Sequence, residues 1–291
     1  ENIASIPTTI DTAGEFRYQN NLFFKKDVAL FVSQSGETAD TIGALSAVKE
    51  FKIPSVAIVN MPHSSIARAS DVSVLSCAGA ELGVASTKAF SAQVMNMLSL
   101  SLLAAKIKGV KDDQVKAVRK EVQGLPTAID FVFKQWPKIA SIAQTYKNMH
   151  GFYFLGRGIL LPIAYEGALK LKEISYIHAE GYPLAEMKHG PIALIDKQFA
   201  AIVLLKKGEL LKKGLAAVEE IRARGGKVIA VSDEEKIIDN VDELILLPDI
   251  DEMIAPILFV LPLQILAYEV ALAKGLNPDR PRNLAKSVTV E

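Results

Sequence analysis

The chain repeats its own order of apolar strands and helices. An apolar run at residues 28–32 leads through a Gly-Glu turn into a helical segment around 44–48 and then into a second apolar run at 56–59. The same order recurs at 200–204, 208–209, 216–219 and 228–231. Short apolar strands that alternate with longer helix-period segments are typical of parallel βαβ units with helices on both faces of the sheet. The sequence therefore predicts two copies of one α/β fold.

The correspondence extends beyond these segments, from Asp71 to Asp242 and from Gln93 to Gln264, each glutamine lying in an apolar helix. The second copy opens with a strand and glycine turn at 152–158 and a helix from Tyr165 to Tyr176, for which no partner precedes the first copy. We expect the chain to start inside its first lobe, with that strand and helix N-terminal to Glu1.

Three regions follow from the repeat. We expect an N-terminally incomplete first lobe at 1–125, a second lobe at 126–275, and a C-terminal tail at 276–291 that lies over the active site. The stretch at 111–146 is charged at first and then amphipathic, and we expect it to be helical, with breaks at Pro126 and Pro137.

Composition excludes several classes of partner. Lys+Arg and Asp+Glu both total 33, so no long-range field gathers nucleic acid or an anionic membrane. The single cysteine, Cys77, cannot form an internal disulfide, which favours the cytoplasm. Because Cys77 ends an apolar run at 72–77, we expect a small buried hydrophobe rather than a nucleophile. The most apolar run, 254–268, is short for a membrane span and is predicted to be a buried helix.

A hydroxyl-rich loop at 33–38 follows the first strand and consists of Ser33, Gln34, Ser35, Gly36, Glu37 and Thr38. Backbone N–H groups at a helix start, a glycine and hydroxyl donors suit a phosphate, although Ser35 and Thr38 are also ordinary helix caps. The second copy keeps the Gly-Glu turn at 206–210 but has no hydroxyls. The turn is therefore structural and the hydroxyls are additional, which favours a phosphate site.

A second polar loop, 83–88, contains Val84 and Ser86 and also precedes a helix, whereas its counterpart at 254–257 is apolar. Site residues thus concentrate in loops of the first lobe, at the carboxyl ends of parallel strands where ligands bind in open sheets.

The helix from Tyr165 to Tyr176 carries Glu166, Lys170 and Glu173 at spacings of four and three residues, so the three share one face. A solvated ladder of ion pairs is the ordinary interpretation. The flanking apolar residues favour a semi-buried face, where a cation between two carboxylates tunes one of them as a proton shuttle.

Two further segments carry possible chemistry. A polar loop spans 178–183 and 186–191 and contains His189, which can move a proton near neutral pH but could equally be an exposed loop histidine. The tail at 281–291 has too little apolar surface to form an element of its own. It is either disordered or places Lys286 over a site as an amine nucleophile.

These motifs resemble sugar isomerase (SIS) domains and, within them, the isomerase portion of the glutamine:fructose-6-phosphate aminotransferase family. The resemblance covers essentially the whole chain, and its most specific parts are residues 33–41, 85–88, 166–173 and 286–291. It implies two SIS lobes, each a mainly parallel sheet flanked by helices, with an irregular tail. It also implies a sugar-phosphate enzyme of amino-sugar biosynthesis that uses no metal and no cofactor.

The resemblance also implies roles for individual residues. Ser33, Gln34, Ser35 and Thr38 would hold the phosphate, and Ser86 with the Val84 backbone would contact sugar hydroxyls. Glu173 would move a proton between C1 and C2, with Lys170 and Glu166 beside it. Lys286 would form a Schiff base with C2. His189 would open the sugar ring from the neighbouring subunit of a homodimer.

Two departures from the family pattern limit this expectation. The family obtains ammonia from a glutamine-hydrolysing domain, which nothing in this sequence supplies, and its Gly-Thr-Ser strand would fall before Glu1. Another SIS enzyme that isomerises or cleaves an amino-sugar phosphate, or a non-catalytic sugar-phosphate sensor, remains an alternative.

Overall fold

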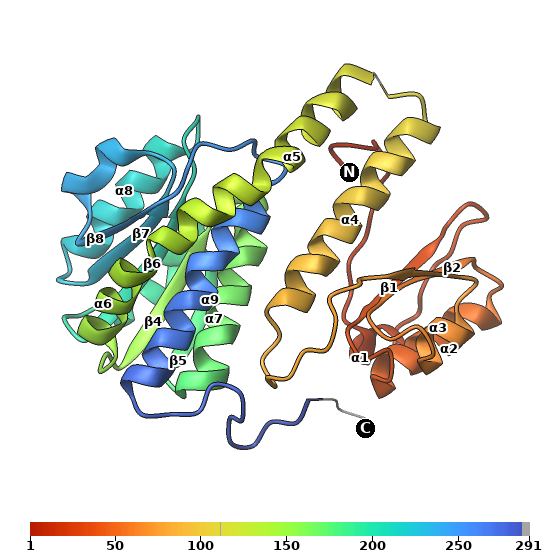
Figure 1. The fold of residues 1–291 in the computed structure, drawn as a ribbon, viewed down its shortest axis with the longest axis horizontal. Coiled ribbons are helices and arrows are strands. Elements are labelled where there is room, and N and C mark those ends of the chain that lie inside the picture. The colour runs from red at the N-terminus through yellow and green to blue at the C-terminus, as the bar shows by residue number, and fades with distance from the viewer. Residues whose placement is uncertain (111, 287–291) are drawn as a thin grey trace. The chain divides into compact units, whose positions relative to one another are not determined.

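The computed structural model describes residues 1–110 and 112–286 (Figure 1). The chain divides into two compact units, one formed by residues 1–115 with the segment from Asn283, and the other by residues 116–282. This division lies ten residues before the predicted boundary at 125 and assigns the described end of the tail to the first unit. Residues 287–291 of the predicted tail motif lie outside the described residues.

The second unit is built on a parallel sheet with strand order β5-β4-β6-β7-β8. Its strands are β4 (Gly151–Gly156), β5 (His178–Pro183), β6 (Phe199–Leu205), β7 (Lys227–Ser232) and β8 (Glu243–Leu246). Its helices include α6 (Trp136–Tyr146), α7 (Leu161–Ser175), α8 (Leu211–Arg222) and α9 (Ala255–Ala273). Short 3-10 segments at Gly158–Leu160, Leu184–His189, Pro191–Leu194 and Glu235–Asn240 connect them.

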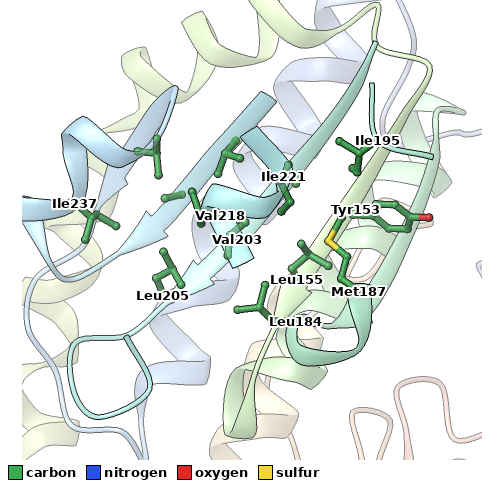
Figure 2. Packing of buried hydrophobic residues seen from close by; sticks show 14 of the residues in the cluster. Tyr153, Leu155, Leu184, Met187, Ile195, Val203, Leu205, Val218, Ile221 and Ile237 are labelled. Atoms are coloured by element: carbon green, nitrogen blue, oxygen red, sulfur yellow. The ribbon is translucent and has the colours of Figure 1, made fainter. Parts of the chain in front are cut away.

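Helices cover both faces of this sheet, as the run of buried residues along its strands requires. Tyr153 and Leu155 of β4 point into a core cluster that includes Val218 and Ile221 of α8 (Figure 2). Phe154 points the other way, where it lies close to Gly167 of α7. Alternation along one strand therefore supplies both hydrophobic cores, which is the arrangement expected of a doubly covered parallel sheet.

The first unit contains a parallel sheet with strand order β1-β2-β3. The strands are β1 (Ala29–Ser33), β2 (Ser55–Val59) and β3 (Val72–Leu75), and the helices are α1 (Ala13–Phe16), α2 (Ala39–Glu50), α3 (Ser65–Ala69) and α4 (Lys88–Ile107). One face packs Phe31, Ala57 and Val59 against Leu45 and Val48 of α2. The crossover β1-α2-β2 places the loop after β1 at the carboxyl edge of the sheet.

Equivalent hydrogen bonds in the two sheets support the prediction that the chain contains two copies of one fold. Asp71 accepts the backbone N–H of Ser55 at 2.8 Å, and Asp242 accepts that of Val228 at 2.9 Å. In each copy the aspartate precedes the last strand and ties it to the start of its neighbour. The Ser55 hydroxyl and backbone bonds hold the pKa of Asp71 below its usual range. Asp71 and Asp242, which the repeat predicted to be equivalent, therefore make the same hydrogen bond in the two sheets.

The second sheet has two strands, β4 and β5, that have no counterpart among the described strands of the first. Strand β4 and helix α7 are the opening elements that the repeat predicted for the second copy. The expectation of a polar loop at 178–183 is wrong, because this segment is the edge strand β5, paired in parallel with β4. Its polar residues did not show the apolar alternation by which strands are recognised.

Three further expectations can be compared with the structure. Cys77 is exposed with a φ of 52°, so the expected buried position is wrong, since β3 ends at Leu75 and the chain turns there. Pro137 lies in the first turn of α6, whereas α5 (Asp112–Lys134) continues through Pro126 instead of ending there.

The apolar run at 254–268 forms α9, most of which is buried, as predicted. By length and composition alone, α4 and α9 are the helices of the described chain that could cross a membrane. For α9 its burial identifies a core helix instead, and for α4 this criterion alone is weak evidence.

Candidate active site

The loop between β1 and α2 is held together by its own hydroxyl groups. Ser33 Oγ accepts the N–H of Gly36 at 3.0 Å and lies 3.0 Å from Thr38 Oγ1. Ser35 Oγ accepts the N–H of Glu37 at 3.2 Å. Thr38 occupies the N-cap position of α2, but its side chain does not cap the helix. The hydroxyls therefore shape a compact loop at a helix start, which is the arrangement that suits a phosphate group.

Two neighbouring contacts fix this loop against α3. The Glu37 carboxylate accepts the N–H of Ser65 at 2.7 Å, and the Gly36 carbonyl accepts the N–H of Ile66 at 3.0 Å. The hydrogen bonds from Ser65 lower the pKa of Glu37. Gly36 has a φ of 67°, and a Cβ there would collide with the side chain of Ser64. Only glycine fits this position, for both backbone and steric reasons.

Gly36→Ala should therefore destabilise the protein by about 2–4 kcal/mol, the sum of a left-handed backbone penalty and an overpacking penalty. Urea denaturation followed by circular dichroism measures this change. Gly109→Ala is the matched control, because Gly109 has a φ of 73° but nothing within 4 Å of the added Cβ. Equal losses in the two variants would contradict the steric part of the argument.

The corresponding loop of the second unit is occupied by an internal ion pair. Lys206 Nζ lies 2.6 Å from Asp233 Oδ2, and the Lys207 N–H donates to Asp233 Oδ1 at 2.6 Å. The Asp233 side chain is fully buried, and Lys207 Nζ pairs with Asp249 at 3.1 Å. Asp233 therefore takes up the Lys206 ammonium and the Lys207 N–H, the groups that would otherwise bind an anion. The geometry thus supports the inference from the repeat that only the first unit's loop is suited to phosphate.

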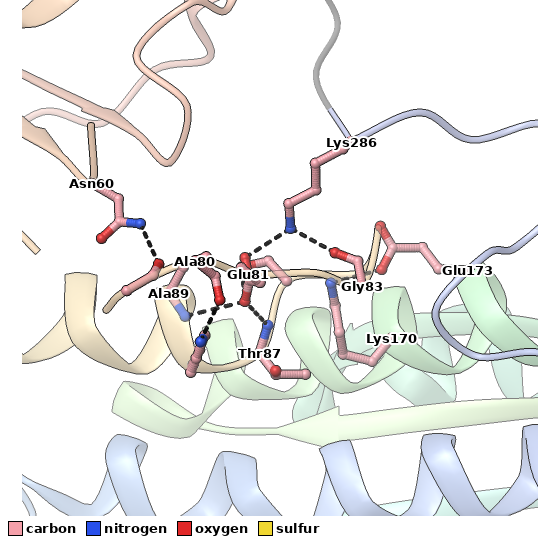
Figure 3. Close-up of polar contacts among 12 residues, drawn as sticks. Asn60, Ala80, Glu81, Gly83, Thr87, Ala89, Lys170, Glu173 and Lys286 are labelled. Atoms are coloured by element: carbon pink, nitrogen blue, oxygen red, sulfur yellow. Dashed lines mark hydrogen bonds and ion pairs between the residues drawn. The ribbon is translucent and has the colours of Figure 1, made fainter. Parts of the chain in front are cut away.

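The loop before α4 brings together the second predicted polar segment and the tail. Lys286 Nζ donates to the Gly83 carbonyl at 2.6 Å and lies 3.0 Å from Glu81 Oε2 (Figure 3). Ser86 Oγ lies 3.4 Å from Glu81 Oε1. Lys286 therefore has a defined position beside the segment 84–86, which is compatible with the expectation that it lies over a site. Glu81 was not predicted, since a single acidic residue in a loop carries no signal of its own.

Helix α7 presents the predicted charged face. Lys170 Nζ lies 2.6 Å from Glu173 Oε2 and 3.5 Å from Glu166 Oε1 (Figure 3). The side chains of Lys170, Glu166 and Glu173 are 4%, 11% and 21% exposed. The solvated ladder of ion pairs is thus excluded, and the semi-buried alternative holds. A half-buried carboxylate beside a buried cation is suited to accepting and returning a proton.

The C-terminal end of α7 anchors the chain just before the tail. Tyr176 adopts a left-handed conformation with a φ of 60° and ends the helix. Its hydroxyl accepts the backbone N–H of Arg282 at 2.7 Å, and the Arg282 guanidinium lies 4.3 Å from the ring centroid. This cation–π contact and hydrogen bond fix residue 282 within the second unit. The sequence predicted Tyr176 as the end of this helix but not its contacts with Arg282.

The predicted site residues divide between the units. Ser33, Gln34, Ser35, Thr38, Val84, Ser86 and Lys286 belong to the first unit, and Glu166, Lys170, Glu173 and His189 to the second. His189 ends a 3-10 segment, Leu184–His189, and is exposed. Among residues 1–110 and 112–286, no group of three His, Cys, Asp or Glu side chains could hold a metal ion.

Two parallel-sheet α/β units, one with a hydroxyl-rich loop before a helix, define a duplicated α/β protein. The SIS domain family matches residues 1–103 and 146–274, and the chain belongs to this family. The predicted fold class and resemblance are thereby confirmed.

The chain is 45% identical over its whole length to the glutamine–fructose-6-phosphate aminotransferase [isomerizing] of Escherichia coli K12. It covers 48% of that protein, so it spans about half the length of the curated relatives it matches.

Solved structures agree with this assignment. The C-terminal domain of glucosamine-fructose-6-phosphate aminotransferase from Francisella tularensis superimposes with a TM-score of 0.90 and 39% identity, over 96% of this chain and 80% of that one. Glucosamine-6-phosphate deaminase from Thermotoga maritima gives a TM-score of 0.72 at 25% identity, over 95% of this chain and 80% of that one. The chain is thus similar to the C-terminal part of the aminotransferases.

Proposed function

We propose that this chain is the isomerase half of a glutamine–fructose-6-phosphate aminotransferase. It converts fructose 6-phosphate and ammonia into glucosamine 6-phosphate and water, in the pathway that leads to UDP-N-acetylglucosamine. The observation that carries the proposal is the 45% identity along the whole chain, together with the TM-score of 0.90 to a C-terminal domain of such an enzyme. Ketose–aldose isomerisation of the sugar phosphate is the partial reaction that this half performs by itself.

The substrate phosphate binds to the loop of residues 33–38. Ser33, Ser35 and Thr38 lie between the end of β1 and the N-cap of α2, and backbone N–H groups and the helix dipole at the start of α2 favour an anion. Gln34 adds an amide donor. Ser86 and the Val84 backbone contact the sugar hydroxyls.

Five side chains take part in the chemistry. His189 opens the sugar ring and is contributed by the neighbouring subunit of a homodimer. Lys286 forms an imine with C2 of the open ketose, which acts as an electron sink. Glu173 then transfers a proton between C1 and C2. Lys170 and Glu166 hold Glu173 in place, which the ion pairs at 2.6 and 3.5 Å support.

The amination step needs ammonia from a partner. The relatives are about twice as long as this chain and carry glutamine in their names. A glutaminase domain of the full-length protein therefore supplies the ammonia, and the reaction takes place in the cytoplasm.

The test is conversion of fructose 6-phosphate to glucose 6-phosphate by this chain without glutamine. We expect turnover, and borohydride should attach the ketose phosphate to the peptide that contains Lys286. Lys286→Ala should show neither. If the chain binds the sugar phosphate tightly but does not turn it over, this result would contradict the proposal that it is an enzyme and would favour a non-catalytic sensor.

A related amino-sugar phosphate enzyme is the second candidate, and the similarity to a glucosamine-6-phosphate deaminase is the observation that favours it. Such an enzyme would release ammonia from glucosamine 6-phosphate faster than it isomerises fructose 6-phosphate. Comparing the two rates on one preparation separates the candidates.

The phosphate loop makes a separate prediction about binding. Ser35→Ala should weaken fructose 6-phosphate binding about 10-fold, the effect of losing one hydrogen bond to a charged group. Calorimetry should also give one site per chain, because the second unit's loop is occupied by Asp233. Lys207→Ala is the control in that loop, and an equal loss of affinity in this variant would contradict the assignment.

A further inference from the structure

Glu81 is a buried carboxylate that the predicted catalytic set does not include. Its side chain is 4% exposed, although it lies in an irregular loop between β3 and α4. Burying a carboxylate is costly unless hydrogen bonds and an opposite charge compensate for it. The groups that surround Glu81 therefore indicate its purpose.

One carboxylate oxygen of Glu81 fixes the start of α4. Oε1 accepts the N–H of Thr87 at 2.8 Å and the N–H of Ala89 at 3.3 Å (Figure 3). A carboxylate at a helix N-terminus is stabilised by the helix dipole. This oxygen thus holds the loop that carries Val84 and Ser86, the residues proposed to contact the sugar.

The other oxygen of Glu81 holds the side chain of Lys286. Oε2 lies 3.0 Å from Nζ, and the Gly83 carbonyl accepts a second hydrogen bond from Nζ at 2.6 Å. Burial opposes ionisation of Glu81, but the bonds from Thr87 and Lys286 outweigh it and keep the pKa of Glu81 below its usual range. The lysine is 32% exposed, so it remains accessible while two of its three N–H directions are fixed.

We propose that Glu81 is a positioning residue for Lys286, which it aims and whose positive charge it neutralises throughout the reaction. This inference rests on the proposed function. The lysine ammonium first sheds one proton, because only the free amine has a lone pair, and the amine nitrogen then forms a bond with C2 of the carbonyl. The carbon–oxygen bond breaks, and the oxygen leaves as water with that proton and a second proton from the nitrogen. The product is a protonated imine. Because one positive charge is present before and after this step, a fixed carboxylate stabilises both states.

Glu81→Gln tests the proposal, because the amide keeps the size and an acceptor oxygen for the N–H groups of Thr87 and Ala89 but loses the charge. We expect the rate of borohydride trapping on Lys286 and the kcat of isomerisation to fall about 30-fold, the effect of losing a charged hydrogen bond, with KM nearly unchanged. Glu81→Asp keeps the charge and should recover part of the loss. Glu50→Gln, an exposed position at the end of α2, is the matched control.

A second readout needs no substrate. Acetic anhydride reaches Nζ from solvent and needs no alignment with a bound ketose, so it should acetylate Lys286 several-fold faster in Glu81→Gln than in the wild type, because the ion pair that masks Nζ is lost. Thermal melting of each variant checks that the chain is folded. If Glu81→Gln traps ketose and turns over like the wild type, Glu81 only caps α4 and the proposal is overturned.

Failure of the proposed function has a different signature. If the wild type itself traps no ketose phosphate, Lys286 is not the nucleophile and that function fails. Acetylation then decides the role of Glu81 by itself. Faster acetylation in Glu81→Gln supports Glu81 as the residue that holds Lys286, and equal rates overturn it.

Discussion

Glu173→Gln should lower the rate of fructose 6-phosphate isomerisation about 1,000-fold, in the middle of the range for removal of a general base. The amide matches the carboxylate in size but cannot accept the C1 proton. The loss should appear in kcat, because Glu173 acts on the proton in transit and the phosphate is held by the loop at 33–38. A coupled assay that detects glucose 6-phosphate measures the rate.

The control for this prediction is Glu219→Gln, which removes an exposed carboxylate from α8 of the same unit and should leave the rate unchanged. Fructose 6-phosphate should bind to Glu173→Gln with nearly the wild-type affinity. A Glu173→Gln enzyme that retained more than about a tenth of the activity would assign the proton transfer to another group.

Lys170→Met should destabilise the protein by about 3–5 kcal/mol. The methionine fills the space of the lysine stem, but the carboxylates of Glu166 and Glu173 lose the cation that lies 3.5 and 2.6 Å away. Because both side chains are largely shielded from water, solvent replaces that cation poorly. Chemical denaturation at neutral pH measures the change in the free energy of unfolding.

Two comparisons make this prediction specific. Lys172→Met removes an exposed lysine from the same helix and should change stability by less than about 0.5 kcal/mol. The triple variant that adds Glu166→Gln and Glu173→Gln should regain much of the lost stability, because no uncompensated charge remains. Equal effects of Lys170→Met and Lys172→Met would show that the charged face of α7 is solvated after all.

The strands and the charged face of α7 could be predicted because their signals are local. Apolar runs such as 28–32 and 200–204 mark buried parallel strands, and their repetition identifies the matching elements. The spacing of Glu166, Lys170 and Glu173 places the three residues on one helical face whatever surrounds the helix. Burial of that face depends on packing, and the flanking apolar residues indicated it correctly.

Edge elements were harder to predict. β5 carries polar residues because it lies at the edge of its sheet, so its sequence resembles a loop. Cys77 follows a short strand at the edge of the other sheet, where the chain turns out of an apolar run. In both places the apolar pattern is weak or misleading because one side of an edge strand needs little burial.

The sequence by itself determined that the chain is a duplicated α/β protein, that its hydroxyl loop lies in the first copy, and that α7 carries a charged face. Each of these depends on residues close together in the chain, where backbone periodicity dictates the geometry. Only the tertiary structure decided that Asp233 occupies the corresponding loop of the second copy and that Glu81 pairs with Lys286. Glu81 and Lys286 are 205 positions apart, and no local sequence pattern specifies which buried carboxylate a distant lysine will contact.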